Sequence, residues 1–414
     1  MKLIKYKIFE TVSKSLFFLI MLYFLSVEQA GLFGSITLVI NFFSVVSGFE
    51  SHICLQRELV NKSNNEIQKI IKSALIFFCI NYLITIPILA LALFKFGVNG
   101  WILIISCFII AVSEHICNMA YNLAIVHEEY IKAMPLIITK NIILISATIF
   151  MILNKYENTL SYILCLWAVI SSVILLLFIR FIIVKQSMSG SPLFSMNLEA
   201  IKFLYRNTYI NFLIGAVAVL SLQFDRLIVS LNMTESEVGV YFRHVSVISI
   251  LYQLFNIISY NKLVPKIFSV AKHSNRVNLK KIINKEYNYI LIISFLSIIA
   301  LYFSVQYLFA NYIAKFEIDI VILIVLLLNF TIRSYADFMS LIFNAFRFES
   351  RILFFQLTSL VIGVLVLYFL IPVYKINGVL MAIVSSTLLY SLLMILFCPQ
   401  TMKTKNYQQV GIKN

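Results

Sequence analysis

Charged side chains are scarce in this chain of 414 residues. Only 12% of the residues are charged and 61% are hydrophobic, whereas a soluble domain has about 25% charged residues. Many apolar runs reach the roughly 20 residues that a membrane-spanning helix needs. The composition therefore excludes a soluble globular protein and predicts an integral membrane protein.

The motifs of the common enzyme classes are also missing. The sequence contains no G-x-x-x-x-G-K-[ST], no H-E-x-x-H and no G-x-S-x-G. No segment outside the predicted spans is long enough to fold as a catalytic domain. The six cysteines are scattered without a C-x-x-C pair, which argues against a disulfide framework or a zinc site. We expect a protein that is not an enzyme and needs neither a cofactor nor a metal.

The apolar runs predict an all-α fold, because lipid cannot satisfy bare backbone groups and the alternation of barrel strands is absent. We predict about twelve transmembrane helices in two pseudo-symmetric six-helix lobes around a central cavity. The predicted spans are 10–27, 31–53, 72–94, 100–125, 133–153, 159–183, 208–231, 239–260, 287–313, 319–345, 351–372 and 377–398.

Basic residues outnumber acidic ones, 33 against 18, and their distribution predicts the orientation. With the N-terminus inside, the outer loops hold only Lys95, Lys155, Lys315 and Lys375. We assigned nearly all other basic residues to cytoplasmic loops, which places both termini in the cytoplasm. They are spread over many loops and form no single stripe, so we expect contact with anionic lipid headgroups and none with nucleic acid.

A repeated motif suggests that one unit is written twice. S-V-E-Q-A-G-L-F at 26–33 is matched, half a chain later, by T-E-S-E-V-G-V-Y at 234–241. Each copy is an acidic turn followed by glycine and an aromatic residue. Many transporters consist of such repeats, with the substrate site between them. We predict an N-terminal lobe at 1–184, a cytoplasmic linker at 185–207, a C-terminal lobe at 208–398 and a cytoplasmic tail at 399–414.

Ionisable residues inside the predicted spans are the candidate functional residues, because each costs roughly 2.5–3.5 kcal/mol at mid-bilayer. Asp225 and Arg243 lie at similar depths and could pair across a hairpin. Arg333 and Asp337 are four residues apart and share a helix face. Ion pairs that merely lock helices together are the alternative reading. The set also includes His244, and Glu50 and His52, which we expect to reach the cytoplasmic headgroups. The candidates for function are Glu114, His115, Asp225, Arg226, Arg243, Arg333 and Asp337.

Three segments resemble a known family. The stretch 223–241, Q-F-D-R-L-I-V-S-L-N-M-T-E-S-E-V-G-V-Y, resembles the signature of bacterial polysaccharide flippases across helices seven and eight. L-V-P-K-I-F at 263–268 and F-E-S-H-I-C-L-Q-R at 49–57 resemble their exits from helices eight and two. The chain is thus similar to Wzx-type O-antigen flippases of the MOP superfamily, which also includes MATE drug exporters and the lipid II flippase.

This resemblance implies a substrate, an undecaprenyl-diphosphate-linked oligosaccharide turned from the cytoplasmic to the periplasmic leaflet of the bacterial inner membrane. It implies H⁺ or Na⁺ as coupling ion, and a polysaccharide polymerase and a chain-length regulator as partners. We expect the diphosphate to bind Arg333 and Arg226, with Arg243 in reserve, and the sugar path to include tyrosines. Charge balance or ion coupling would fall to Glu114, Asp225, Asp337 and His115. The tyrosines are Tyr121, Tyr241 and Tyr335.

Other functions remain open at this point. A MATE-like multidrug exporter would need an acidic or aromatic cavity with few arginines, so the three intramembrane arginines argue against it. A membrane-bound polymerase or ligase would need a large periplasmic loop. A flippase for teichoic-acid or capsule precursors would use the same chemistry on a different sugar.

Overall fold

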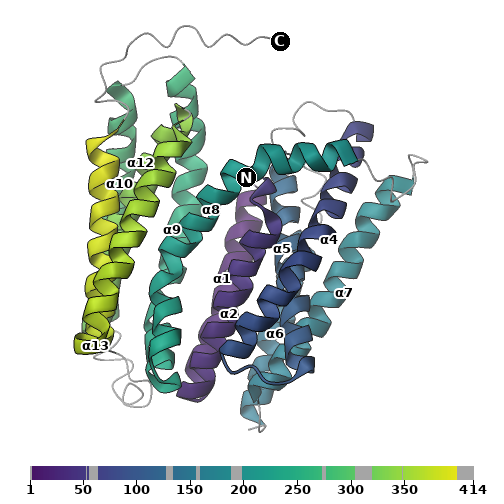
Figure 1. The fold of residues 1–414 in the computed structure, drawn as a ribbon, viewed down its shortest axis with the longest axis horizontal. Coiled ribbons are helices and arrows are strands. Elements are labelled where there is room, and N and C mark those ends of the chain that lie inside the picture. The colour runs from purple at the N-terminus through teal and green to yellow at the C-terminus, as the bar shows by residue number, and fades with distance from the viewer. Residues whose placement is uncertain are drawn as a thin grey trace. The chain divides into compact units, whose positions relative to one another are not determined.

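The computed structural model describes residues 2–52, 54–55, 64–126, 134–154, 159–187, 198–272, 277–303, 319–346 and 348–398. Its described secondary structure is helical (Figure 1). The helices are α1 (Lys2–Phe24), α2 (Val27–Gly48), α4 (Asn64–Lys95), α5 (Trp101–Val126), α6 (Met134–Leu153), α7 (Thr159–Ser187), α8 (Leu198–Asn232), α9 (Glu235–Lys272), α10 (Val277–Phe303), α12 (Ile320–Ala345) and α13 (Glu349–Leu396).

These helices confirm the predicted all-α class, and each predicted span overlaps one of them. The last two predicted spans, 351–372 and 377–398, both lie in α13, which is broken by a kink at Lys375 (φ 46°, ψ −125°) shortly after Pro372. A proline inside a helix removes a hydrogen bond and bends the backbone. Within the described residues, eight helices are long and apolar enough to cross a membrane.

Parts of the predicted organisation fall outside the described residues. They are 188–197 of the linker, 304–313 of the ninth span and the whole tail at 399–414. The division into lobes at 184 and 208 and the orientation of the termini stay predictions. The chain itself forms two compact units: the first runs through α1 to α8 and along α9 to Leu254, and the second holds the rest of α9, α10, α12 and α13.

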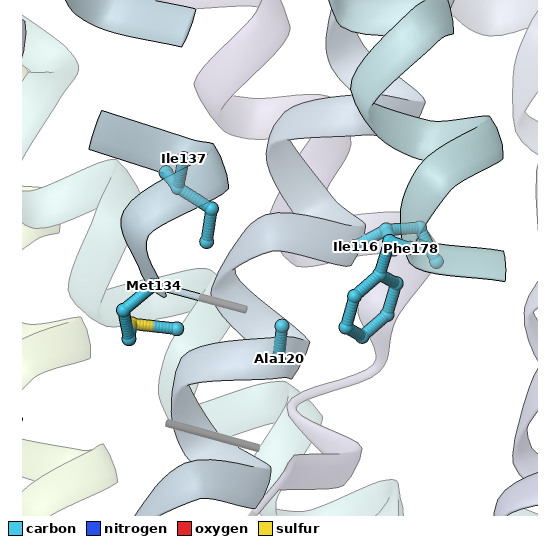
Figure 2. Close-up of a cluster of buried hydrophobic side chains, with 5 residues drawn as sticks. All are labelled: Ile116, Ala120, Met134, Ile137 and Phe178. Carbon is cyan, nitrogen blue, oxygen red and sulfur yellow. The ribbon is translucent and has the colours of Figure 1, made fainter. Parts of the chain in front are cut away.

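The first unit is held together by long helix–helix contacts. Helix α1 packs along α6, α5 along α7, and α2 against α4, α5 and α8. Figure 2 shows one apolar cluster of this unit, where side chains of α5, α6 and α7 meet. Its members are Ile116, Ala120, Met134, Ile137 and Phe178. In the second unit, α12 packs against both α10 and α13.

The two copies of the repeated motif begin two helices in the same way. Ser26 caps α2, where its hydroxyl accepts a hydrogen bond from the backbone N–H of Gln29 at 3.2 Å. At the start of α9, the Thr234 hydroxyl and the Glu237 carboxylate accept reciprocally from each other's backbone N–H. These are capping arrangements that satisfy the free donors of a helix start.

The repeated glycines bring these two helix starts into backbone contact. A Cβ added to Gly31 would overlap the carbonyl oxygen of Glu235, and one added to Gly239 would overlap that of Val27. Gly31 therefore faces the carbonyl four residues before Gly239, and Gly239 faces the carbonyl four residues before Gly31. The contact is thus pseudo-two-fold. Small residues allow helices in membranes to approach this closely.

Replacing Gly239 by alanine should destabilise the first unit, because the new methyl group meets backbone rather than a flexible side chain. We expect a loss of about 1–3 kcal/mol, the usual cost of overpacking. The check is thermal unfolding of the purified protein in detergent. Ser236→Ala, at an exposed position of the same helix turn, serves as control, and equal stability of the two variants would contradict the close contact.

Candidate functional site

Of the three predicted site arginines, Arg226 has the fewest described partners for its guanidinium. It lies on α8, six residues before the helix ends at Asn232, and its side chain is partly exposed. One Nη donates to the Ser249 hydroxyl at 2.8 Å, while its buried Nε has no hydrogen-bond partner. No ion pair of Arg226 occurs within the described part of the chain. The guanidinium therefore keeps donors available for an anionic ligand.

The neighbouring Asp225 faces a different partner. The hydroxyl of Tyr241 on α9 donates to its carboxylate at 2.5 Å, and both side chains are buried. Consecutive residues point about 100° apart on a helix, as the 3.6-residue turn requires. Asp225 thus links α8 to α9, and Tyr241, which is fully buried, stabilises that link.

Arg243 lies on α9, two residues after Tyr241, and is 3% exposed. Its Nε donates to the carbonyl of Leu22 at 2.7 Å and an Nη to the carbonyl of Leu25 at 3.1 Å. The last carbonyls of a helix lack partners within it, so Arg243 caps the C-terminal end of α1. Its described hydrogen bonds are thus structural ones, between α9 and α1.

Arg333 and Asp337 lie on one face of α12, as predicted, and form an ion pair with 3.2 Å between Nε and Oδ1. Both side chains are buried. The guanidinium carbon of Arg333 also sits 4.4 Å from the ring centre of Tyr390 on α13, a cation–π contact. In this second-unit cluster one positive and one negative side chain therefore face each other.

Glu114 on α5 is held by two lysines at 2.5 Å, Lys14 of α1 and Lys140 of α6. The assignment of these two lysines to cytoplasmic loops is wrong, because Lys14 lies within α1 and Lys140, 1% exposed, lies within α6. Its partner Glu114 explains why it can be buried there, since a buried charge needs an opposite one. Glu114 therefore balances lysines, where we had expected it to balance arginines.

The remaining candidates are His115, Tyr121 and Tyr335. The Nδ1 of His115 lies 2.6 Å from the Tyr82 hydroxyl. His115 and Tyr121 both line a cavity of about 300 Å³ inside the first unit. Tyr335 belongs to the second unit, where its hydroxyl donates to the Asn284 side chain at 3.2 Å. No cluster that could hold a metal ion occurs among the residues with described positions.

Comparisons with known proteins identify the fold through solved structures, and comparisons of the sequence find no match. No family model matches the sequence, and no curated protein matches it. Among solved structures, an inward-facing MATE multidrug transporter of the MOP superfamily has a TM-score of 0.69 at 15% identity, covering 94% of this chain and 93% of that one. The lipid II flippase MurJ in an inward closed conformation has a TM-score of 0.67 at 15% identity, covering 94% and 86%.

A MATE transporter of Vibrio cholerae has a TM-score of 0.62 at 13% identity, covering 95% of this chain and 94% of that one. The structures that share this fold are transporters and a flippase rather than enzymes. The chain is accordingly a multi-pass membrane protein with a transporter fold of the MATE and MurJ type.

Proposed function

We propose that this protein is a flippase for an undecaprenyl-diphosphate-linked oligosaccharide. The observation that carries the proposal is the uncompensated guanidinium of Arg226 on α8, in a fold shared with a lipid II flippase. A sugar headgroup cannot cross lipid unaided, because each hydroxyl without a partner costs a few kcal/mol. A polar path through a helical transporter removes that cost while the lipid tail stays in the bilayer.

The diphosphate is the group that Arg226 would recognise. A guanidinium matches phosphate oxygens with two parallel hydrogen bonds, and such charge-assisted bonds are about twice as strong as neutral ones. An acceptor oxygen would also satisfy the unpartnered Nε. Arg333 is the second receptor at another depth, with Asp337 as the anion that leaves it when the diphosphate arrives. Arg243 holds α1 and is the least suited of the three.

The membrane potential favours this direction of transport. The cytoplasm is negative, so an anion gains about 2.3 kcal/mol per charge at 100 mV on moving outward. Two diphosphate charges gain roughly 4.6 kcal/mol. Return of the empty carrier then needs a cation, for which H⁺ or Na⁺ is the coupling ion. The protein would work in the bacterial inner membrane beside the polymerase and chain-length regulator that use its product.

A multidrug exporter is the second candidate, favoured by the likeness to MATE transporters. An organic cation would need an available carboxylate. Glu114 is held by two lysines, Asp337 by Arg333, and Asp225 by the Tyr241 hydroxyl. These three carboxylates are thus engaged while Arg226 keeps spare donors, which favours an anionic substrate. A teichoic-acid or capsule precursor would satisfy the same chemistry.

Deleting the gene in its host separates these functions. We expect lipid-linked oligosaccharide to accumulate and surface polysaccharide to disappear, with restoration by the wild-type gene. Uptake and efflux of a cationic dye such as ethidium should be unchanged. Normal polysaccharide together with dye hypersensitivity would overturn the flippase and favour the exporter.

A further inference from the structure

The cavity of the first unit has the lining of a small-molecule site. Its volume of about 300 Å³ falls at the lower end of ligand pockets in proteins. Polar side chains come from the start of α1, from α2 and the residues after it, and from α5. They are Lys7, Ser44, Glu50, Ser51, His52, His115, Asn118, Tyr121 and Asn122. The function proposed above gives no role to most of them.

Helix α5 presents one polar stripe to this cavity. His115, Asn118 and Asn122 are spaced by three and four residues, so they share a helix face. The Asn118 side chain is exposed although it lies in an apolar span from Trp101 to Leu123. It has no hydrogen bond to any residue whose position is described. An amide that faced lipid would forfeit its hydrogen bonds at considerable cost, so this stripe faces water or a polar ligand.

Another part of the cavity lining comes from the end of helix α2 and the residues after it. Helix α2 ends at Gly48, its C-cap residue Phe49 has φ 53°, and Glu50 follows with φ 47°. Left-handed backbone is rare for residues other than glycine, costs about 1–3 kcal/mol per residue and occurs often at ligand sites. The change of chain direction at these two residues is followed by Ser51 and His52, and Glu50, Ser51 and His52 all line the cavity.

Two close contacts involve the charged side chains around the cavity. Nδ1 of His52 lies 3.2 Å from a Glu50 carboxylate oxygen, and Lys7 forms an ion pair with Glu10 at 2.7 Å. Lys7 also lies over one face of the Tyr121 ring, 4.4 Å from its centre. Beside these groups the lining offers amides, hydroxyls and ring faces. Amide groups both donate and accept, which matches sugar hydroxyls, since these do the same.

We propose that this cavity binds one sugar ring of the lipid-linked oligosaccharide, with Asn118 and Asn122 on its hydroxyls. The inference rests on the proposed function and adds a second subsite to it. The cavity recognises the neutral sugar, whereas Arg226 recognises the diphosphate. Binding of the whole headgroup then needs both, and each can be removed separately.

The test measures binding of two lipids to the purified protein in nanodiscs. One is the lipid-linked oligosaccharide extracted from the host, and the other is undecaprenyl diphosphate without sugar. We expect Asn118→Leu to weaken binding of the first lipid about tenfold, because a sugar hydroxyl would lose its hydrogen-bond partner. Binding of the second lipid should stay unchanged, which also shows that the variant is folded. Asn154→Leu, an exposed asparagine outside the cavity, is the control and should change neither.

The outcomes separate the two proposals. If Asn118→Leu affects both lipids equally or affects neither, the sugar subsite is wrong while the flippase stands. If the wild-type protein binds neither lipid, the proposed function falls and the subsite with it. Stronger binding of undecaprenyl diphosphate than of the lipid-linked oligosaccharide to the wild-type protein would also overturn the sugar subsite.

Discussion

Replacing Arg226 by glutamine should reduce translocation of the lipid-linked oligosaccharide by about 10- to 100-fold. A hydrogen bond to a charged group contributes about 1.5–3 kcal/mol, and 1.4 kcal/mol corresponds to a factor of ten. Glutamine can keep a hydrogen bond to Ser249 but cannot hold two phosphate oxygens as a guanidinium does. The measurement is restoration of surface polysaccharide in the deletion strain, scaled to the amount of protein in the membrane.

Two matched variants separate substrate binding from helix packing. Ser249→Ala removes the described hydrogen-bond partner of Arg226 and should leave transport nearly unchanged. Arg226→Lys keeps the positive charge but lacks the two parallel N–H donors of the guanidinium, and should have an intermediate effect. If Ser249→Ala impairs transport as severely as Arg226→Gln, the arginine serves to join α8 to α9 and its role in diphosphate binding is refuted.

Glu114→Gln should produce the largest loss of stability. The substitution leaves Lys14 and Lys140 without the carboxylate that both contact. Removing one partner from a buried ion pair typically costs about 3–5 kcal/mol, because the remaining charge stays in a medium of low polarity. We expect a strongly reduced unfolding temperature in detergent and little protein in the membrane.

The double variant Glu114→Gln with Lys140→Met tests the cause. It removes the most deeply buried lysine together with its partner, so part of the lost stability should return. Glu28→Gln, an exposed acidic residue in the first turn of α2, should cost less than about 0.5 kcal/mol. A Glu114→Gln protein as stable as wild type would show that the two lysines do not depend on this carboxylate.

The sequence predicted the helices well because lipid leaves the backbone few options. Each apolar run had to be a helix, and Pro372 marks the place where two predicted spans join within α13. The glycines and their neighbours indicated the repeat, but the motif did not predict that the two copies contact each other. Gly31 and Gly239 face each other's helix starts, so their absent side chains have a packing reason.

The candidate site was predictable in its residue types and less so in its partners. Arg333 and Asp337 could be paired from their four-residue spacing, because such pairs share a helix face. Lys140 could not be recognised as a partner of Glu114, because the two come from different helices. Only the packing of α1, α5 and α6 brings them together. The one available signal was a lysine seven residues inside an apolar span. Assigning every basic residue to a loop, as the prediction of orientation does, hides that signal.

Reconstitution into liposomes tests the central claim most directly. The purified protein is incorporated into vesicles that carry undecaprenyl-diphosphate-linked oligosaccharide in both leaflets, and a lectin outside the vesicles captures the sugar that reaches it. We expect nearly all of the lipid to become accessible with wild-type protein and only the outer-leaflet half without it, while with Arg226→Gln the inner-leaflet half should become accessible about 10- to 100-fold more slowly. Equal accessibility in vesicles with and without the wild-type protein, at any membrane potential, would contradict a flippase.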